Sequence, residues 1–224
     1  MRPNPRWIIE TGTKFGGSAI FFASLLTLCG QTRGGVLTVD LHLRPEAREG
    51  IAAHPHGHLV RAVVEGDAAD PAIIRDFAAR IARDPGPVLV FLDDDHNAEH
   101  VYREMQGYAP LVSPGSYLIV ADTVFADLAG TPVGQTTEKY PDVLRSNPRV
   151  AINRFLDERT DFARVDPPIP HGPSNFHDGF LLRALLSLAP SGVEGASEMF
   201  STGRMPRPAC FSNPSTQRNV RRKR

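Results

Sequence analysis

The sequence predicts an α/β fold in which a mostly parallel sheet of seven strands is flanked by helices. Short apolar runs alternate with helical stretches along most of the chain, which is typical of strands that are covered on both faces. A glycine-rich turn follows the first apolar run, at the position where open α/β sheets bind ligands. An acidic residue stands at the end of each of the first five runs.

The predicted strands are the apolar runs bounded by glycine, proline and polar residues. They are Trp7–Glu10, Val36–Leu41, Leu59–Glu65, Val88–Leu92, Ser116–Ala121, Phe162–Val165 and Phe180–Leu186. We expect the last two to close the sheet as an antiparallel hairpin, with a long loop from Pro167 to Gly179 between them.

Helical stretches lie between the predicted strands. They cover Ser18–Leu28, Pro45–Ala53, Pro71–Arg83 and Ala98–Leu111. Pro45 and Pro71 stand where the first turn of a helix tolerates proline. Beyond Asp122, we expect a loop over Thr123–Thr137 and a helix over Val143–Glu158 that Pro148 interrupts.

Length and composition indicate one large domain. Of 224 residues, 41% are hydrophobic and 22% are charged, as in a globular protein. We expect the domain to cover residues 1–188 and residues 189–224, rich in Ser, Pro and Gly, to form an irregular or disordered tail. A basic cluster closes this tail, and we expect it to be solvated.

The charge balance and the cysteines exclude several classes of partner and site. The formal net charge is zero, so there is no overall electrostatic attraction to nucleic acid or to an anionic membrane. The longest apolar stretch, Ala19–Cys29, is too short to span a bilayer. Cys29 and Cys210 match no metal or redox spacing. Without a signal peptide, we expect a cytoplasmic protein.

The turn after the first strand predicts a cofactor site. It reads E-x-G-T-x-x-G-G-S from Glu10 to Ser18 and leads into an apolar helix. Glycine permits positive φ and close approach of a ligand, and the helix N-terminus offers free N–H groups. The spacing differs from the dinucleotide pattern G-x-G-x-x-G, so it favours S-adenosylmethionine (SAM) over NAD. The predicted cofactor residues here are Glu10, Gly12, Thr13, Gly16 and Ser18.

The acids at the other strand ends extend this site. Asp40, after the second strand, is placed to accept hydrogen bonds from ribose hydroxyls, or is a loop carboxylate. Asp67, after the third strand, either contacts the adenosine or caps the next helix. Asp93 and Asp122 follow neighbouring strands, and adjacent carboxylates repel unless a cation lies between them. Mg²⁺ with oxygen ligands would resolve that repulsion.

His96 is predicted as the general base, because imidazole exchanges protons near neutral pH and stands three residues after Asp93. His100, one turn further on, is the second choice for this role. The alternative for His96 and its neighbours is a role in the first turn of the following helix.

Several segments together resemble the cephalosporin-hydroxylase-type and rhamnosyl O-methyltransferase family of class I SAM-dependent methyltransferases. They are IIETGTKFGGSAIFFASL, VLTVDL, VLVFLDDDHNAEHVYREMQGYAPLVSPGSYLIVADT and SNFHDGFLLRAL. The resemblance implies a Rossmann-like fold, SAM bound by the turn with Asp40, Asp67 and Asp93, and Mg²⁺ bound by Asp93, Asp122 and Thr123. His96 takes the position of a catalytic lysine in related catechol-type methyltransferases.

The resemblance also implies transfer of a methyl group to a hydroxyl of a small polyol, above all a deoxysugar of a natural product, and a possible homo-oligomer. The family's Glu-Asp-Thr reads Ala121-Asp122-Thr123 here, and its usual N-terminal helical segment is not found before the first strand. These two departures leave open a non-catalytic protein that binds SAM and assists another enzyme. An NAD-linked oxidoreductase has only fold analogy in its favour.

Overall fold

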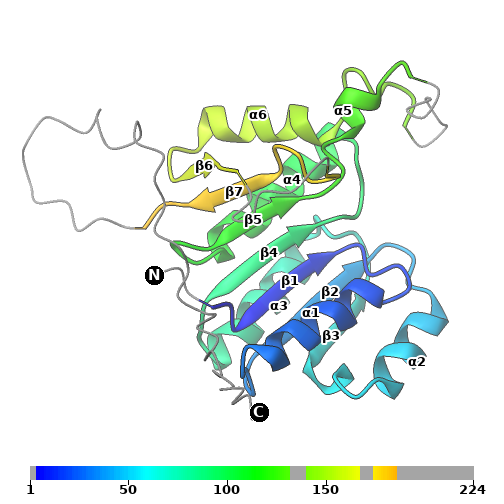
Figure 1. Cartoon of the computed structure of the whole chain (residues 1–224), viewed down its shortest axis with the longest axis vertical. Coiled ribbons are helices and arrows are strands. Elements are labelled where there is room, and N and C mark those ends of the chain that lie inside the picture. The colour runs from blue at the N-terminus through cyan, green and yellow to red at the C-terminus, as the bar shows by residue number, and fades with distance from the viewer. Residues whose placement is uncertain (1–3, 132–139, 167–173, 186–224) are drawn as a thin grey trace, which may run out of the picture. The chain divides into compact units, whose positions relative to one another are not determined.

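The computed structural model describes residues 4–131, 140–166 and 174–185. Within these residues seven strands form one sheet in the order β3-β2-β1-β4-β5-β7-β6 (Figure 1). The strands are β1 (Trp7–Thr11), β2 (Gly35–Asp40), β3 (Val60–Glu65), β4 (Val88–Leu92), β5 (Tyr117–Val120), β6 (Phe162–Arg164) and β7 (Phe180–Arg183). The first five pair in parallel, and β7 pairs antiparallel with both β5 and β6. The predicted α/β fold and its closing hairpin are confirmed.

Six α-helices cover the sheet in the described part of the chain. They are α1 (Gly17–Leu28), α2 (Pro45–Ala53), α3 (Pro71–Arg83), α4 (Ala98–Tyr108), α5 (Phe125–Leu128) and α6 (Pro148–Glu158). Figure 1 shows α1 and α2 in front of the sheet and α3 and α4 behind it. Both faces of the central strands are therefore buried, which explains their nearly continuous apolar sequences.

Two apolar clusters form the core, one on each face. Alternate residues of β1 divide between them, because successive side chains of a strand point to opposite faces. Ile9 packs in the cluster that α3, α4 and α6 close, whereas Ile8 packs with Ala19, Ala23 and Leu26 of α1. This core fixes the strand ends at one edge of the sheet, where the predicted site residues lie.

Three predictions beyond the central sheet were wrong, and proline explains two of them. The predicted helix over Val143–Glu158 begins only at Pro148, and Asn147 caps it by accepting from the Val150 N–H at 3.2 Å. The predicted helix Ala98–Leu111 changes to a 3₁₀ turn at Ala109, since Pro110 cannot donate to the helix.

The third error concerns the loop predicted over Thr123–Thr137, which contains the single-turn helix α5. So short a helix leaves no periodicity to detect. Residues 132–137 of this loop, 167–173 of the hairpin loop and the predicted tail 189–224 lie outside the described residues.

Gly12 packs the end of β1 against the end of β4. Its φ is +89°, and a Cβ there would lie 2.1 Å from the carbonyl oxygen of Asp93. Its N–H also donates to the carbonyl oxygen of Val39 at 2.8 Å. The sequence analysis explained this glycine by close approach of a ligand, but the structure explains it by close approach of two strand ends.

Gly12→Ala is therefore expected to lower the free energy of unfolding by at least about 1–3 kcal/mol, the typical cost of an unfavourable backbone conformation, with the steric overlap adding to it. Urea denaturation followed by circular dichroism measures this. Gly17→Ala is the matched control, since a Cβ there would meet no atom within 4 Å among the described residues beyond its chain neighbours and its own helix backbone. Equal stability of the two variants would contradict the packing role of Gly12.

Candidate functional site

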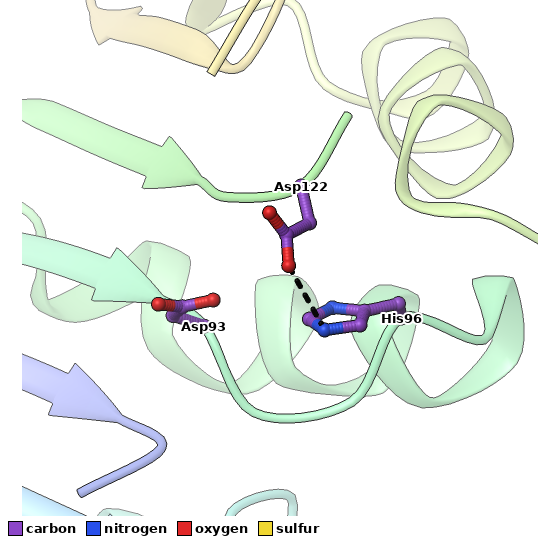
Figure 2. Close-up of side chains that lie close together, drawn as sticks. All are labelled: Asp93, His96 and Asp122. Carbon is purple, nitrogen blue, oxygen red and sulfur yellow. Dashed lines mark ion pairs between the residues drawn. The ribbon is translucent and has the colours of Figure 1, made fainter. Parts of the chain in front are cut away.

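Asp93, His96 and Asp122 meet at the carboxyl ends of β4 and β5. Figure 2 shows Asp93 at the end of β4, Asp122 after β5 and His96 on the loop that leads to α4. One ligand atom from each side chain lies within 4.8 Å of the others. The Nε2 atom of His96 is 3.1 Å from a carboxylate oxygen of Asp122, and both side chains are largely shielded from solvent, at 16% and 24% exposure. The juxtaposition predicted from the strand order is thus present.

The backbone at Asp122 has a positive φ of 52°. Few residues other than glycine adopt this conformation, and Asp and Asn are among those that tolerate it. Such backbone conformations concentrate at functional sites. The left-handed turn at Asp122 ends β5 and places the carboxylate beside His96.

Burial above all, together with the nearby charge of Asp122, raises the pKa of Asp93 to about 7. Lys14 opposes the shift. A carboxyl group in this position binds either a proton or a cation near neutral pH.

The donor set fits a divalent cation. Asp93 and Asp122 supply the hard carboxylate oxygens that Mg²⁺ prefers, and the His96 imidazole lies beside them. Thr123 does not share this orientation: its buried hydroxyl donates to the backbone carbonyl oxygens of Asn175 and His177. This contact ties the end of β5 to the loop before β7 and lends no support to Thr123 as a metal ligand.

Mg²⁺ is expected to stabilise the protein strongly near pH 8 and hardly at all near pH 5.5. The unfolded chain releases the Asp93 proton near pH 4 and the folded chain near pH 7, so without metal the free energy of unfolding falls as pH rises through this interval. Above pH 7 the charged carboxylate is free for the cation. Thermal unfolding with and without Mg²⁺ at both pH values measures the difference, and an equal Mg²⁺ effect at the two values would contradict this site.

The glycine-rich turn rests on a buried carboxylate. Glu10 is fully buried in β1, where it accepts from the Thr38 hydroxyl at 2.6 Å, and Thr38 is hydrogen-bonded in turn to Thr13. Ser18 also favours the charged form of Glu10, but burial dominates and raises its pKa to about 7. The Oε1 atom of Glu10 has no hydrogen-bond partner in the part of the chain that the structure describes. This unpaired acceptor fits a cationic or hydrogen-bond-donating ligand group at the base of the turn.

Thr13 and Ser18 are held from beneath the turn. Their hydroxyls belong to the network beneath it, with Glu10 and Thr38. Gly16, with φ of 81°, precedes α1 and lies against Ile51 of α2. Whether these residues touch the cofactor stays a prediction.

Asp40 closes the turn from the side. One carboxylate oxygen accepts from the N–H of Lys14 at 2.6 Å, and the other accepts from the N–H of His42 at 2.9 Å. Each oxygen retains a further acceptor site. Asp40 is thus held beside the turn, where ribose hydroxyls are expected.

Two roles were open for Asp67, and the structure excludes one of them, because Asp67 does not cap the next helix. The cap of α3 is Asp70, which accepts from the N–H of Ala72 at 2.7 Å. Asp67 accepts from the N–H of Ala69 at 2.9 Å and lies 3.9 Å from His100. Its predicted contact with adenosine is the role that remains.

Two aromatic rings that the sequence analysis did not select hold His96. Phe125 and Tyr140 stack on the imidazole, with ring centroids 5.1 and 5.4 Å away and nearly parallel planes. Phe125 belongs to α5, the helix that the sequence analysis missed. The rings restrict the orientation of His96 and provide an apolar wall beside the cation cluster.

Comparison with known proteins identifies a family to which this chain is similar. The profile of the family described as rhamnosyl O-methyltransferase/CmcI matches residues 1–184. A rhamnosyl O-methyltransferase of Mycobacterium tuberculosis (strain H37Rv) is 37% identical over 184 residues, which are 80% of this chain and 67% of that protein. Its counterpart in Mycobacterium leprae (strain TN) is 35% identical over 132 residues, which are 58% of this chain and 52% of that protein.

Solved structures support the same fold. The O-methyltransferase TomG from Streptomyces achromogenes, in complex with SAM, superposes with a TM-score of 0.53 at 21% identity, covering 80% of this chain and 73% of that one. The MycE methyltransferase of the mycinamycin pathway, in complex with Mg, S-adenosylhomocysteine (SAH) and mycinamycin VI, superposes with a TM-score of 0.51 at 18% identity. The match covers 85% of this chain and 49% of that one. At these identities the similarity concerns the fold.

Proposed function

The chain belongs to the rhamnosyl O-methyltransferase/CmcI family of SAM-dependent O-methyltransferases, and from this premise we propose that it methylates a hydroxyl of a deoxysugar with the help of Mg²⁺. The arrangement of Asp93, His96 and Asp122 is the observation that supports the metal and the base most strongly. The names of the relatives support a rhamnose-type acceptor.

SAM supplies an activated methyl group, so the protein has to bind it, align it and deprotonate the acceptor. The turn from Glu10 to Ser18 would hold the methionine part, with the unpaired Oε1 of Glu10 as an acceptor at its base. Asp40 would hold the ribose, and Asp67 would lie toward the adenine.

Asp93 and Asp122 would hold Mg²⁺, which lowers the pKa of a nearby hydroxyl and favours a vicinal diol as acceptor. His96 would take the proton of the acceptor hydroxyl. Phe125 and Tyr140 keep its imidazole in one orientation through their stacking contacts. The same rings offer an apolar surface suited to the C–H face of a deoxysugar.

The first test is calorimetric titration of the protein with SAH, with Mg²⁺ and after EDTA. We expect micromolar binding, followed by methylation of a methyl rhamnoside on incubation with SAM and Mg²⁺, detected by mass spectrometry. A 2-deoxy analogue without the vicinal diol is the matched control and is expected to react poorly. Absence of SAH binding would refute the enzymatic function for this chain.

Ala121 favours a second candidate function, that of a non-catalytic protein. It is buried where relatives are expected to carry a carboxylate, and a non-catalytic protein that binds SAM and assists another enzyme would tolerate that change. Such a protein would bind SAH without any effect of Mg²⁺ and without methyl transfer. Activity that EDTA abolishes would exclude it.

A natural-product pathway, a homo-oligomer and a cytoplasmic location stay predictions from the sequence. Among the described residues, no helix is both long enough and apolar enough to cross a bilayer.

A further inference from the structure

We propose that Asp94, His100 and Glu104 form a second cation site, separate from the Asp93–His96–Asp122 cluster, and that this site takes Zn²⁺. The three side chains come from the loop after β4 and from one face of α4, and one ligand atom of each lies within 4.8 Å of the others. None of the three side chains has a role in the methyl transfer proposed above.

The carboxylate of Glu104 is the main evidence for an ion at this position. Its side chain is fully buried, and neither carboxylate oxygen has a hydrogen-bond partner among the described residues. Thr11 lies close enough to favour the charged form, but burial dominates and raises the pKa of Glu104 to about 8. A buried acid without hydrogen-bond partners costs stability unless a ligand compensates it.

The distances from His100 to the two carboxylates suit a shared ion better than direct hydrogen bonds. Its Nε2 atom lies 3.4 Å from an oxygen of Asp94 and 3.7 Å from an oxygen of Glu104, and no group of the described residues makes a hydrogen bond of good geometry with it. Two ligand atoms of one tetrahedral zinc ion lie about 3.4 Å apart, given zinc–ligand bonds of about 2.0–2.2 Å. The three atoms therefore need only small shifts to surround one ion.

The chemistry of the donors selects the ion. An imidazole with two carboxylates favours Zn²⁺ over Mg²⁺, which prefers an all-oxygen octahedral set. The two carboxylates would also neutralise a divalent charge. A water molecule would complete the tetrahedron.

Arg103 has to move when the ion binds. Its guanidinium donates to Nδ1 of His100 at 3.1 Å, which leaves the imidazole proton on Nε2, the proposed ligand atom. Arg103 is half exposed and already lies 3.7 Å from Asp67. It can therefore turn fully toward Asp67 and let the proton reside on Nδ1. Arg103→Gln is accordingly expected to tighten Zn²⁺ binding.

The bound ion would fix the first turns of α4 to the loop after β4. This loop carries Asp93 and His96, so the second site would hold both in place without touching the reacting atoms. Its role is structural, and thermal stability reports it independently of methyl transfer.

The test uses the full chain, stripped of metal, with the substitution Asp122→Asn to disable the first site. Titration with Co²⁺ is expected to give the intense visible absorption of a tetrahedral cobalt complex at one equivalent. Zn²⁺ is expected to displace the cobalt and to raise the melting temperature. Absence of the band at one equivalent would overturn the proposal.

Adding Glu104→Gln, which keeps the shape of the side chain, is expected to weaken Co²⁺ and Zn²⁺ binding by at least roughly 100-fold, since even groups that only hydrogen-bond to a metal ligand contribute 10–100-fold to metal affinity. If that protein does not fold, as judged by circular dichroism, His100→Gln replaces it. His56→Gln, which replaces a half-buried histidine between α2 and β3, is the matched control and is expected to keep the band. An unchanged band with Glu104→Gln, or its loss with His56→Gln alone, would overturn the assignment.

Discussion

His96→Gln is expected to lower kcat by roughly 10²–10⁴-fold, the usual contribution of a general base, while SAH binds as before. His96 lies 3.1 Å from Asp122 and contacts the rings of Phe125 and Tyr140. Glutamine preserves polarity and approximate size but cannot take the proton. Steady-state kinetics with a rhamnoside acceptor measures the loss.

The dissociation constant for Mg²⁺ separates two roles of His96. If His96 is the base, its replacement leaves the affinity for Mg²⁺ nearly unchanged. If His96 is a third ligand of the ion, its replacement weakens that affinity. The kinetics must be measured at saturating Mg²⁺, because the raised pKa of Asp93 gives metal binding a pH dependence in the range where a histidine base also titrates. His58→Gln, at an exposed position, is the control. An unchanged kcat at saturating Mg²⁺ would contradict the base assignment.

The central sheet could be predicted because its signals are local. Val88–Leu92, Pro45–Ala53 and Pro71–Arg83 have the predicted bounds, since a continuous apolar run or a first-turn proline marks each of them. Apart from the end of α4 at Pro110, the errors fall after Asp122, where α5 has four residues. A single helical turn is stabilised by packing against other elements, and the sequence carries little signal for it.

The site could be predicted in position but not in detail. Acids at the ends of adjacent parallel strands must meet at one edge of the sheet, and Asp93 and Asp122 do so. The direction of each side chain depends on tertiary contacts. Thr123 turns to the carbonyl oxygens of the loop before β7, and Thr13 to Thr38 beneath the turn. Glu104 escaped notice, although its spacing of four residues from His100 puts both on one helix face.

Asp122→Asn is expected to reduce turnover by roughly three orders of magnitude or more, since a bound cation contributes several kcal/mol of transition-state stabilisation and each 1.4 kcal/mol is a factor of about ten. Asparagine is preferable to alanine because it tolerates the positive φ of 52° at this position. The substitution removes one ligand charge and also the charge that raises the pKa of Asp93.

Calorimetry is expected to show that the Asp122→Asn variant binds SAH like the unaltered protein, because Asp122 lies after β5 and away from the turn that follows β1. Mg²⁺ should no longer raise its melting temperature near pH 8. Asp127→Asn is the matched control: this exposed acid of α5 pairs with Arg149 outside the cluster, so its loss should change turnover little. Full activity of the Asp122→Asn variant in EDTA would instead mean that His96 and the alignment of the substrates suffice without a metal.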